Sequence, residues 1–354
     1  MKFNSVPLLM IGAFSFEKGA FCGQDVKNTL IYEYFLKENI DVKAFDTSEW
    51  RGKVVNIIKN LLYITLTQRP NIMLCSHAVG VSMILIYLVF YKYLFRRKIT
   101  YTVVGYEIND LIDKYFFLKL MLKQFDKIIV ETKMHKNFLI SRGILNVTHI
   151  NNFRNIENNS IKNTNKTRQK LLKVIYFTRI DYRKPIKKLV DIVKYINSNN
   201  LQENYSFNIF GKVASDYEES FFSEISDIKN ITYHGIMDSK EITNKFMDYD
   251  VMIYPQTAKE DVFPGVFLEA FSGKVPVIAI NSNYISEIIK DNINGFLIKS
   301  NDNEAWLERL ELIRKMPDDE YYNFSESTYS NALMYDTKTI VTKLIELFEK
   351  DYIL

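Results

Sequence analysis

The feature that most constrains the fold is an alternation of short apolar runs with longer segments of helical periodicity. In segment 23–39, apolar side chains recur on one face of the expected helix at Val26, Leu30, Tyr34 and Phe35. Strands that alternate with helices in this way are typical of parallel sheets covered by helices. The expected strands are 7–14, 42–45, 71–76, 99–105, 127–131 and 147–152 in the first half of the chain, and 173–180, 205–211, 231–235, 250–255, 275–280 and 294–299 in the second.

The chain divides near its middle, where residues 155–170 are almost entirely polar and have little to bury. We therefore expect an α/β protein with two Rossmann-like parallel-sheet domains, 1–165 and 166–335, that face each other across a cleft. Segment 336–354 begins with Asp336, a good N-cap, and has a one-sided apolar face. It is expected to be a helix that crosses back to pack on the first domain.

Composition places the chain among ordinary globular proteins. Of its 354 residues 47% are hydrophobic and 25% are charged, which argues against extended disorder. Two cysteines, Cys22 and Cys75, are too few for a disulfide framework and fit a reducing cytoplasm. No cluster of Cys and His predicts a metal site. The run 7–14 is followed by Phe-Ser-Phe-Glu-Lys instead of a small-residue cleavage site, so we expect a strand there and not a signal peptide.

One apolar segment, 79–98, has two possible interpretations. Its apolar core stops at Lys92, short of the roughly 20 residues that a bilayer-spanning helix needs. It fits a buried core helix, or a helix that lies in a membrane interface, because the basic trio 96–98 follows at once. Segment 114–125 repeats the mixture of Phe, Leu and Lys. The mildly basic chain, with a net charge of +4, is thus a candidate for peripheral contact with an anionic membrane.

A helix start follows strand 250–255 in the second half. Ligands bind at this end of the strands in open parallel sheets. The first free backbone N–H groups of the helix would be those of Gly265, Val266 and Phe267. Together with the helix dipole they would form an anion site.

Two carboxylates flank this helix start. Glu269, one turn into the helix, could accept two hydrogen bonds from a diol such as a ribose. Asp261, on the loop before the helix, could accept from sugar hydroxyls. Taken singly, Glu269 is also compatible with an ordinary solvated helix residue, and Asp261 with a residue that favours the helix start. Taken together, a phosphate site between two hydroxyl-binding carboxylates describes a nucleotide sugar.

Residues 261–270, Asp-Val-Phe-Pro-Gly-Val-Phe-Leu-Glu-Ala, resemble the signature of the family 4 (group 1) retaining glycosyltransferases, which have the GT-B fold. The usual form of that motif is Glu-Gly-Phe-Pro, four further residues and Glu-Ala. Here Asp261 stands where the family has Glu, and Val262 replaces a Gly. The resemblance implies donor-binding roles for Asp261 and Glu269, with Asp261 also at the reaction centre. Glu260, next to the shorter aspartate, is an alternative for the sugar contact.

The segment after strand 173–180 also resembles this family. Arg179 and, five residues later, Lys184 match the family's Arg and Lys, with Pro185 in place of the usual Gly. The resemblance implies that these two cations neutralise the donor pyrophosphate and the charge that develops on the departing nucleotide. The alternative for each is an ordinary surface cation.

Further family segments contribute glycines. The run 231–242 resembles the segment whose backbone borders the base, which makes Gly235 and Ile236 donor-binding candidates. The strand that ends at Gly211 also has a family counterpart. Segment 12–28 resembles the loop that approaches the donor phosphates and the acceptor, with the candidates Gly12, Gly23 and Gln24. Segment 130–153 resembles one found in capsular-polysaccharide members.

His77 follows strand 71–76 and is expected to point into the cleft, where the family often places a polar side chain near the reacting carbon. It is a catalytic candidate, although a lone histidine is as often structural. The other histidines are not accompanied in the sequence by residues that would form a catalytic or metal-binding group. We interpret Asp248-Tyr249-Asp250 as a helix–strand turn and not a metal motif. Neither Gly-x-Gly-x-x-Gly nor a P-loop is present, which argues against a dehydrogenase or a P-loop NTPase.

The resemblance implies a retaining, metal-independent glycosyltransferase without a cofactor. It would move a sugar from a nucleoside-diphosphate donor, with UDP as the expected nucleotide, to a hydroxyl of a glycan acceptor. The second domain would hold the donor and the first the acceptor. We expect a lipid-linked acceptor in surface polysaccharide assembly, in the cytoplasm at the inner membrane face, and no nucleic-acid partner. The alternatives are a GT-B epimerase or phosphorylase, and a non-catalytic sugar-nucleotide-binding subunit or glycosyltransferase chaperone.

Overall fold

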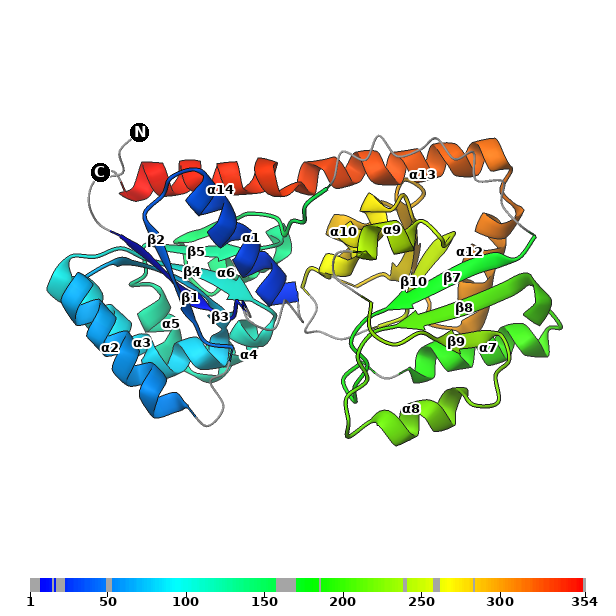
Figure 1. Cartoon of the computed structure of the whole chain (residues 1–354), viewed down its shortest axis with the longest axis horizontal. Helices are drawn as coiled ribbons and strands as arrows, with labels where there is room; N and C mark the ends of the chain where they lie inside the picture. The colour runs from blue at the N-terminus through cyan, green and yellow to red at the C-terminus, as the bar shows by residue number, and fades with distance from the viewer. Residues whose placement is uncertain are drawn as a thin grey trace. The chain divides into compact units, whose positions relative to one another are not determined.

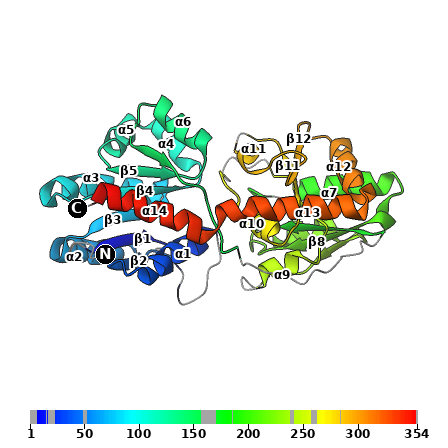
Figure 2. The ribbon, with the colours of Figure 1, turned by 90° about the horizontal axis from the view of Figure 1, so that it is seen from above.

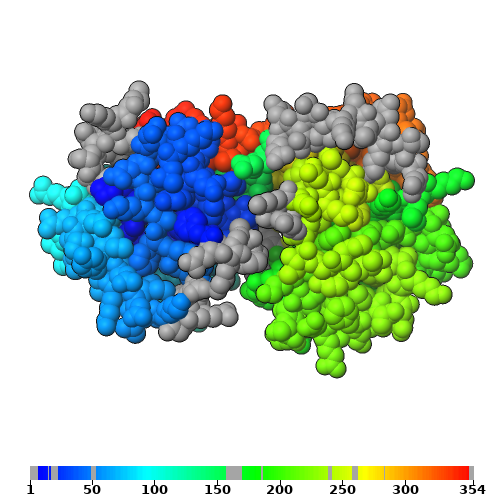
Figure 3. All heavy atoms as spheres, viewed as in Figure 1, coloured from blue at the N-terminus to red at the C-terminus, as the bar shows by residue number. Residues whose placement is uncertain are grey.

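The computed structural model describes residues 7–14, 16, 23–48, 53–156, 170–184, 186–237, 241–256, 262–282 and 284–352. The chain splits into two compact units, each a closely packed body (Figure 3). Unit 1 comprises Met1–Phe153, Glu260–Phe263 and Asp336–Leu354, and unit 2 comprises Arg154–Lys259 and Pro264–Tyr335. The expected boundary between residues 165 and 166 lies outside the described residues.

Unit 1 is built on a six-stranded sheet in the order β2-β1-β3-β4-β5-β6, in which every neighbouring pair is parallel (Figure 1). Its strands are β1 Leu8–Gly12, β2 Val42–Asp46, β3 Asn71–His77, β4 Ile99–Val104, β5 Lys127–Val130 and β6 Val147–His149. Its helices are α1 Gly23–Lys37, α2 Val54–Gln68, α3 Ala78–Phe95, α4 Glu107–Lys114, α5 Phe116–Leu122, α6 Lys133–Ser141 and α14 Thr337–Tyr352.

Alternating residues of β1 and β3 point to opposite faces of this sheet and start two separate cores. Leu9 and Ile11 pack with apolar residues of α2 to α6, whereas Leu8 and Met10 pack with α1 and α14. The C-terminal helix α14 lies across the strands of the first sheet (Figure 2) and contributes four buried residues to the second core, Ile340, Val341, Leu344 and Phe348. The predicted return of the C-terminal helix to the first domain is therefore confirmed.

Unit 2 repeats the plan with the strand order β12-β11-β10-β7-β8-β9, again with parallel neighbours. Its strands are β7 Leu172–Phe177, β8 Tyr205–Phe210, β9 Ile231–Tyr233, β10 Val251–Tyr254, β11 Val277–Ile280 and β12 Gly295–Ile298. Its helices are α7 Lys187–Ser198, α8 Glu218–Ile225, α9 Ile242–Phe246, α10 Gly265–Ser272, α11 Ile285–Ile288, α12 Asn303–Lys315 and α13 Asp318–Ala332, with the 3₁₀ turns Gln202–Asn204 and Leu333–Tyr335. The prediction of two parallel-sheet domains is confirmed.

The strand order of unit 2 changes direction between β7 and β10. The chain proceeds from β7 outward to β8 and β9, and then returns to place β10, β11 and β12 on the other side of β7. In open parallel sheets the crevice beyond the carboxyl ends of the strands at such a reversal is where ligands bind. A ligand is therefore expected at the loops after β7 and β10.

Candidate functional site

The loop after β7 gathers positive charge around one buried carboxylate, that of Asp181. Its Oδ1 accepts the backbone N–H groups of Arg183 at 2.9 Å and Lys184 at 3.1 Å, which fixes the turn. Its Oδ2 accepts hydrogen bonds from Arg179 Nε at 3.0 Å and Nη2 at 2.6 Å. The side chains of Arg179 and Arg183 remain about half exposed. Two guanidiniums contact this carboxylate and Lys184 follows in the same loop, so the loop carries an excess of positive charge.

Two of these loop residues were not among the sequence candidates. The motif indicated Arg179 and Lys184, but Asp181 orders the turn that carries both, and Arg183 contributes a second exposed guanidinium with Nη2 3.3 Å from Asp181 Oδ2. The sequence does contain a signal for this turn, namely the aspartate two residues after Arg179. Aspartate side chains commonly accept hydrogen bonds from backbone N–H groups two and three residues further along the chain. Pro185 lies outside the described residues.

The helix start predicted after β10 is present. Pro264 has an extended backbone, with φ of −63° and ψ of 111°, and α10 begins at Gly265. Gly265 and Val266 occupy the first turn, where backbone N–H groups lack partners within the helix. The N–H of Phe267 instead donates to the carbonyl of Pro264 at 3.1 Å. In this conformation the predicted anion site therefore rests on Gly265 and Val266, and Phe267 serves as a buried anchor.

An arginine that the sequence did not single out lies against this helix start. A Cβ atom on Gly265 would come within 1.9 Å of Arg154 Nη2, so only glycine leaves room for the guanidinium. Arg154 Nε donates to Glu269 Oε1 at 2.9 Å, and the two side chains are 7% and 17% exposed. The backbone N–H of Arg154 donates to the carbonyl of Tyr335 at 3.2 Å.

Because of this ion pair, Glu269 is not a freely solvated helix residue. One of its oxygens already accepts a hydrogen bond from Arg154, so the carboxylate is fixed in direction. The Arg154 guanidinium also brings a charged donor to the same place as the first-turn N–H groups of α10. Sequence reasoning missed it because Arg154 lies 115 residues from Glu269 and carries no motif.

Shortly after the ends of β8 and β9 lie two glycines, Gly211 and Gly235, that are hydrogen-bonded to each other. Gly211 N–H donates to the carbonyl of Gly235 at 2.8 Å, and φ is positive at both, +133° and +80°. A Cβ atom on Gly211 would lie 1.8 Å from the carbonyl oxygen of Thr178, so Gly211 allows the β7 loop to pack against the end of β8. Ile236 follows as an apolar side chain that is 66% exposed at the same edge of the sheet.

The candidates in unit 1 have packing roles in the structure. A Cβ atom on Gly12 would lie 2.5 Å from the carbonyl oxygen of Cys75 and 2.7 Å from Asn28 Nδ2. Gln24 Nε2 donates to the same carbonyl at 2.8 Å, and Gly23 is the first residue of α1. These contacts join α1 to β1 and β3, which explains the residue types at Gly12 and Gln24 without a ligand.

His77 ends β3 and precedes α3, with a side chain that is 55% exposed and Nδ1 3.7 Å from Glu107 Oε2. Its catalytic role stays a prediction. His135, by contrast, is buried with Nε2 2.9 Å from Asn109 Oδ1, and burial lowers its pKa to about 4. Asp248 pairs with Lys245, and Asp250 accepts the N–H of Lys173, so both aspartates serve the fold.

Two predicted residues, Glu260 and Asp261, lie outside the described residues. Within the described residues, no group of three or more His, Cys, Asp or Glu side chains is arranged to hold a metal ion. The described site therefore consists of the β7 loop, the start of α10 with Arg154 and Glu269, and the glycine pair Gly211 and Gly235.

Known structures have the same fold. HepE of Anabaena, solved in complex with UDP and glucose, is 15% identical with a TM-score of 0.72, over 96% of this chain and 99% of that chain. Sucrose-phosphate synthase from Thermosynechococcus elongatus is 12% identical with a TM-score of 0.78, over 98% and 99%. A glycosyltransferase from Rickettsia africae is 16% identical with a TM-score of 0.71, over 99% of both chains. The chain thus has the GT-B fold.

The family described as "Glycosyl transferases group 1" matches residues 157–331, nearly all of unit 2. Unit 2 therefore matches the family of group 1 glycosyltransferases. It is also 26% identical over 192 residues to an uncharacterized 41.2 kDa protein in the cps region of Klebsiella pneumoniae. That match spans 52% of this chain and 51% of the relative, about half the length of each.

Proposed function

We propose that this protein is a retaining, metal-independent glycosyltransferase. It transfers a sugar from a nucleoside-diphosphate donor, with UDP as the nucleotide, to a hydroxyl of a glycan acceptor. The observation that carries the proposal is the positive charge on the loop after β7 beside the start of α10 after β10, because β7 and β10 are hydrogen-bonded neighbours. The UDP complexes of HepE, which shares the fold, support the choice of nucleotide.

The chemistry follows from the charges of the donor. A diphosphate needs cationic and N–H donors, which Arg179, Arg183 and Lys184 offer on one loop, and Gly265 and Val266 on the next. When the bond from the sugar to the diphosphate breaks, negative charge develops on the departing phosphate. The same fixed donors stabilise that charge, and this favours the transition state over bound substrate.

Glu269 would bind the ribose hydroxyls with the carboxylate that Arg154 orients. One of its oxygens is bonded to Arg154 Nε, and the carboxylate lies on the same side of α10 as Gly265. A diol that donates to Glu269 would place its diphosphate toward the helix start. Retention of configuration, with the leaving phosphate accepting the proton of the acceptor hydroxyl, follows from the family resemblance and belongs to the proposal.

The acceptor and pathway are proposed on other grounds. We assign acceptor binding to unit 1 and a place in the assembly of a surface polysaccharide, in the cytoplasm. The relative in the cps region of Klebsiella pneumoniae supports the pathway. A lipid-linked acceptor is consistent with the exposed apolar helices of unit 1.

A donor panel tests the proposed function. The full-length protein is incubated with UDP-, GDP- and ADP-linked sugars, and nucleoside diphosphate release and the anomer of the freed sugar are measured. We expect turnover of a UDP-sugar with retention, unchanged by a chelator. Lys184→Ala and Glu269→Ala should slow it by about a hundredfold or more. Epimerised donor without UDP release, or binding of UDP-sugars without turnover, would instead support the epimerase or the non-catalytic alternative.

A further inference from the structure

Helix α3 presents two apolar faces, of which only one is used by the fold. Its inner face is buried in the first core of unit 1, at Ala78, Val81, Leu85, Leu88 and Tyr91. Its outer face, displaced by about half a turn, carries large apolar side chains that are each more than half exposed, namely Val79, Met83, Ile86, Phe90, Tyr93 and Leu94. A soluble domain rarely leaves such a continuous stripe uncovered.

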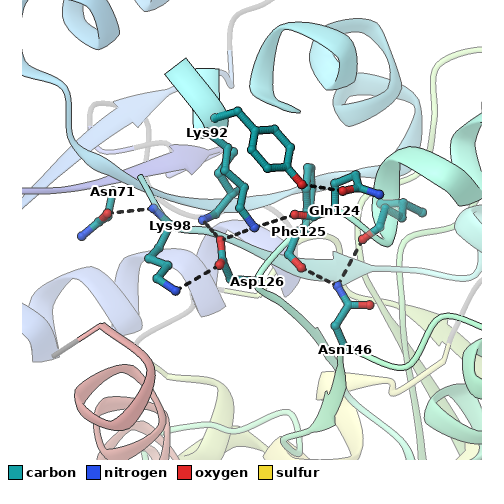
Figure 4. A network of polar contacts seen from close by, with 10 residues as sticks. Asn71, Lys92, Lys98, Gln124, Phe125, Asp126 and Asn146 are labelled. Carbon is teal, nitrogen blue, oxygen red and sulfur yellow. Dashed lines mark hydrogen bonds and ion pairs between the residues drawn. The ribbon is translucent and has the colours of Figure 1, made fainter. Parts of the chain in front are cut away.

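The neighbouring helices extend this stripe into a surface. Helices α2 and α5 pack in the same core as α3, on the face of the sheet opposite α14 (Figure 1). The Thr65 hydroxyl contacts the Tyr87 hydroxyl between α2 and α3, and Tyr93 donates to Gln124 just after α5 (Figure 4). Exposed apolar side chains on these two helices and at their ends are Val54, Val55, Ile58, Tyr63, Leu66, Tyr115, Phe116, Phe117 and Leu120. We call the outward side of α2, α3 and α5 the apolar face.

The segment that contains α2 and α3 carries charges of a single sign. Residues 50–106 contain eight of the chain's 46 Lys and Arg residues and none of its 42 Asp and Glu residues. This segment therefore carries a charge of +8, whereas the remainder of the chain carries −4. Arg96 and Arg97 end α3, and Lys92 and Lys98 share the carboxylate of Asp126 at 3.0 and 3.3 Å (Figure 4).

A lysine at the end of α4 and one within α5 add to this distribution. Lys114 Nζ lies 5.1 Å from the centre of the Tyr115 ring, and Lys119 Nζ lies 5.6 Å from that of Phe116. Cations that lie over aromatic rings beside exposed apolar side chains suit the boundary between the acyl chains and the headgroups of a membrane. There the ring can contact acyl chains while the charge stays among headgroups and water.

By length and composition alone, the whole of α3 is long and apolar enough to cross a bilayer, although its uncharged run stops at Lys92 as the sequence indicated. Its place in the fold argues against crossing. Among the described residues it is the one helix that meets this criterion, and 28% of it is buried inside the structure. Its two ends join β3 and β4, which are paired neighbours in one sheet, and its inner face fills the core. A helix held in this way can lie in an interface but cannot span without dismantling unit 1.

We propose that the apolar face docks unit 1 onto a membrane that contains anionic lipids, with α3 lying in the plane of the interface. Aromatic and aliphatic side chains would enter the headgroup boundary, and the basic residues would attract the lipid charge. The proposal is independent of glycosyl transfer, because it rests on residues of unit 1 outside the donor site.

Vesicle co-sedimentation of the full-length protein tests this proposal. We expect binding to phosphatidylcholine vesicles that contain phosphatidylglycerol, weaker binding to pure phosphatidylcholine, and loss at high salt. Met83→Gln/Phe90→Gln should weaken binding at least about tenfold. The control Leu145→Gln/Leu312→Gln replaces two side chains that are 75% and 45% exposed elsewhere and should bind like the unchanged protein.

Folding and self-association are checked in parallel. Thermal unfolding of the Met83/Phe90 variant should match the unchanged protein, because both side chains are exposed. Equal binding to both lipid mixtures, no binding to either, or unimpaired binding of this variant would each refute the proposal. A dimer in light scattering that dissociates in the variant would also overturn it, since the apolar face would then join two copies of this chain.

Discussion

At the scale of single residues, the pair of Arg154 and Glu269 holds the candidate site together. A guanidinium beside the positive end of a helix dipole is unfavourable by itself, and the Glu269 carboxylate 2.9 Å away offsets it. Both side chains are largely removed from water, so each depends on the other.

Loss of the Glu269 carboxylate should therefore destabilise unit 2. We expect Glu269→Ala to lower the free energy of unfolding by about 3 kcal/mol, because it leaves a buried guanidinium without its carboxylate. Chemical denaturation measures this change. The exposed pair of Arg142 and Asp113 gives the control, since Asp113→Ala should leave the unfolding midpoint where it is. Equal effects of the two substitutions would contradict the role assigned to Arg154.

Alanine at each of the two hydrogen-bonded glycines, Gly211 and Gly235, separates the cost of a positive φ from the cost of a steric clash. Gly235→Ala meets open space and has only its φ of +80° to overcome, at a cost of about 1–2 kcal/mol. Gly211→Ala adds a collision at 1.8 Å with the carbonyl of Thr178, so it should destabilise more and displace the loop that carries Arg179. Thermal unfolding and UDP binding of both variants check this order. A milder effect of Gly211→Ala would show that the two loops are not in contact.

His135 predicts how stability depends on pH. Its pKa is lowered from 6.5 to about 4 by burial, so the unfolded chain binds a proton on this residue at a higher pH than the folded chain. The stability present above pH 6.5 should be lost as the pH falls toward about 4, by up to roughly 3 kcal/mol. Unfolding free energies measured across this range in the protein and in His135→Gln provide the test. In the variant the unfolding free energy should change less steeply with pH, by the equivalent of one proton. Identical pH dependence in the two proteins would contradict the lowered pKa of His135.

At the scale of elements, helix α14 shows how a segment distant in sequence completes a core. Phe348 packs edge-on against Phe35 of α1 with 6.0 Å between ring centres, and Leu344, which is 3% exposed, belongs to the same core. Leu344→Ala should cost about 3 kcal/mol of unfolding free energy, because it leaves a cavity that α14 cannot close. Lys343→Ala, on the exposed side of the same helix, should cost nothing measurable in the same denaturation experiment. If Leu344→Ala is equally silent, α14 is not part of the core of unit 1.

Periodicity predicted the elements well and their ends less well. The strand expected at 173–180 ends at Phe177, because the chain turns there to place Arg179 and Asp181 in the loop. The apolar run 7–14 yields the shorter strand Leu8–Gly12, since Gly12 packs closely against β3 and ends the pairing. The ambiguity of segment 79–98 is resolved in part: α3 does have a core face, and it also has an exposed one.

The motif located the site but not the contacts within it. The local pattern indicated a helix start at Gly265, and the family resemblance implied the cations Arg179 and Lys184. The pairing of Arg154 with Glu269 depends on the fold of unit 2 as a whole. No local pattern contains it.

At the scale of the whole molecule, unit 2 begins with a residue of the site, Arg154. Its backbone N–H is hydrogen-bonded to the carbonyl of Tyr335, the last residue of unit 2. The central claim is that unit 2, which matches the group 1 glycosyltransferase family, binds the diphosphate of a UDP-sugar on the loop after β7 and at the start of α10.

Calorimetric titration of UDP into the full-length protein tests this claim most directly. The matched control is Lys194→Ala, which removes an exposed cation from α7 and should bind UDP as the unchanged protein does. The account predicts saturable binding at one site that Arg179→Ala/Lys184→Ala weakens at least about tenfold. Absence of saturable UDP binding, or equal binding by Arg179→Ala/Lys184→Ala and the unchanged protein, would contradict it.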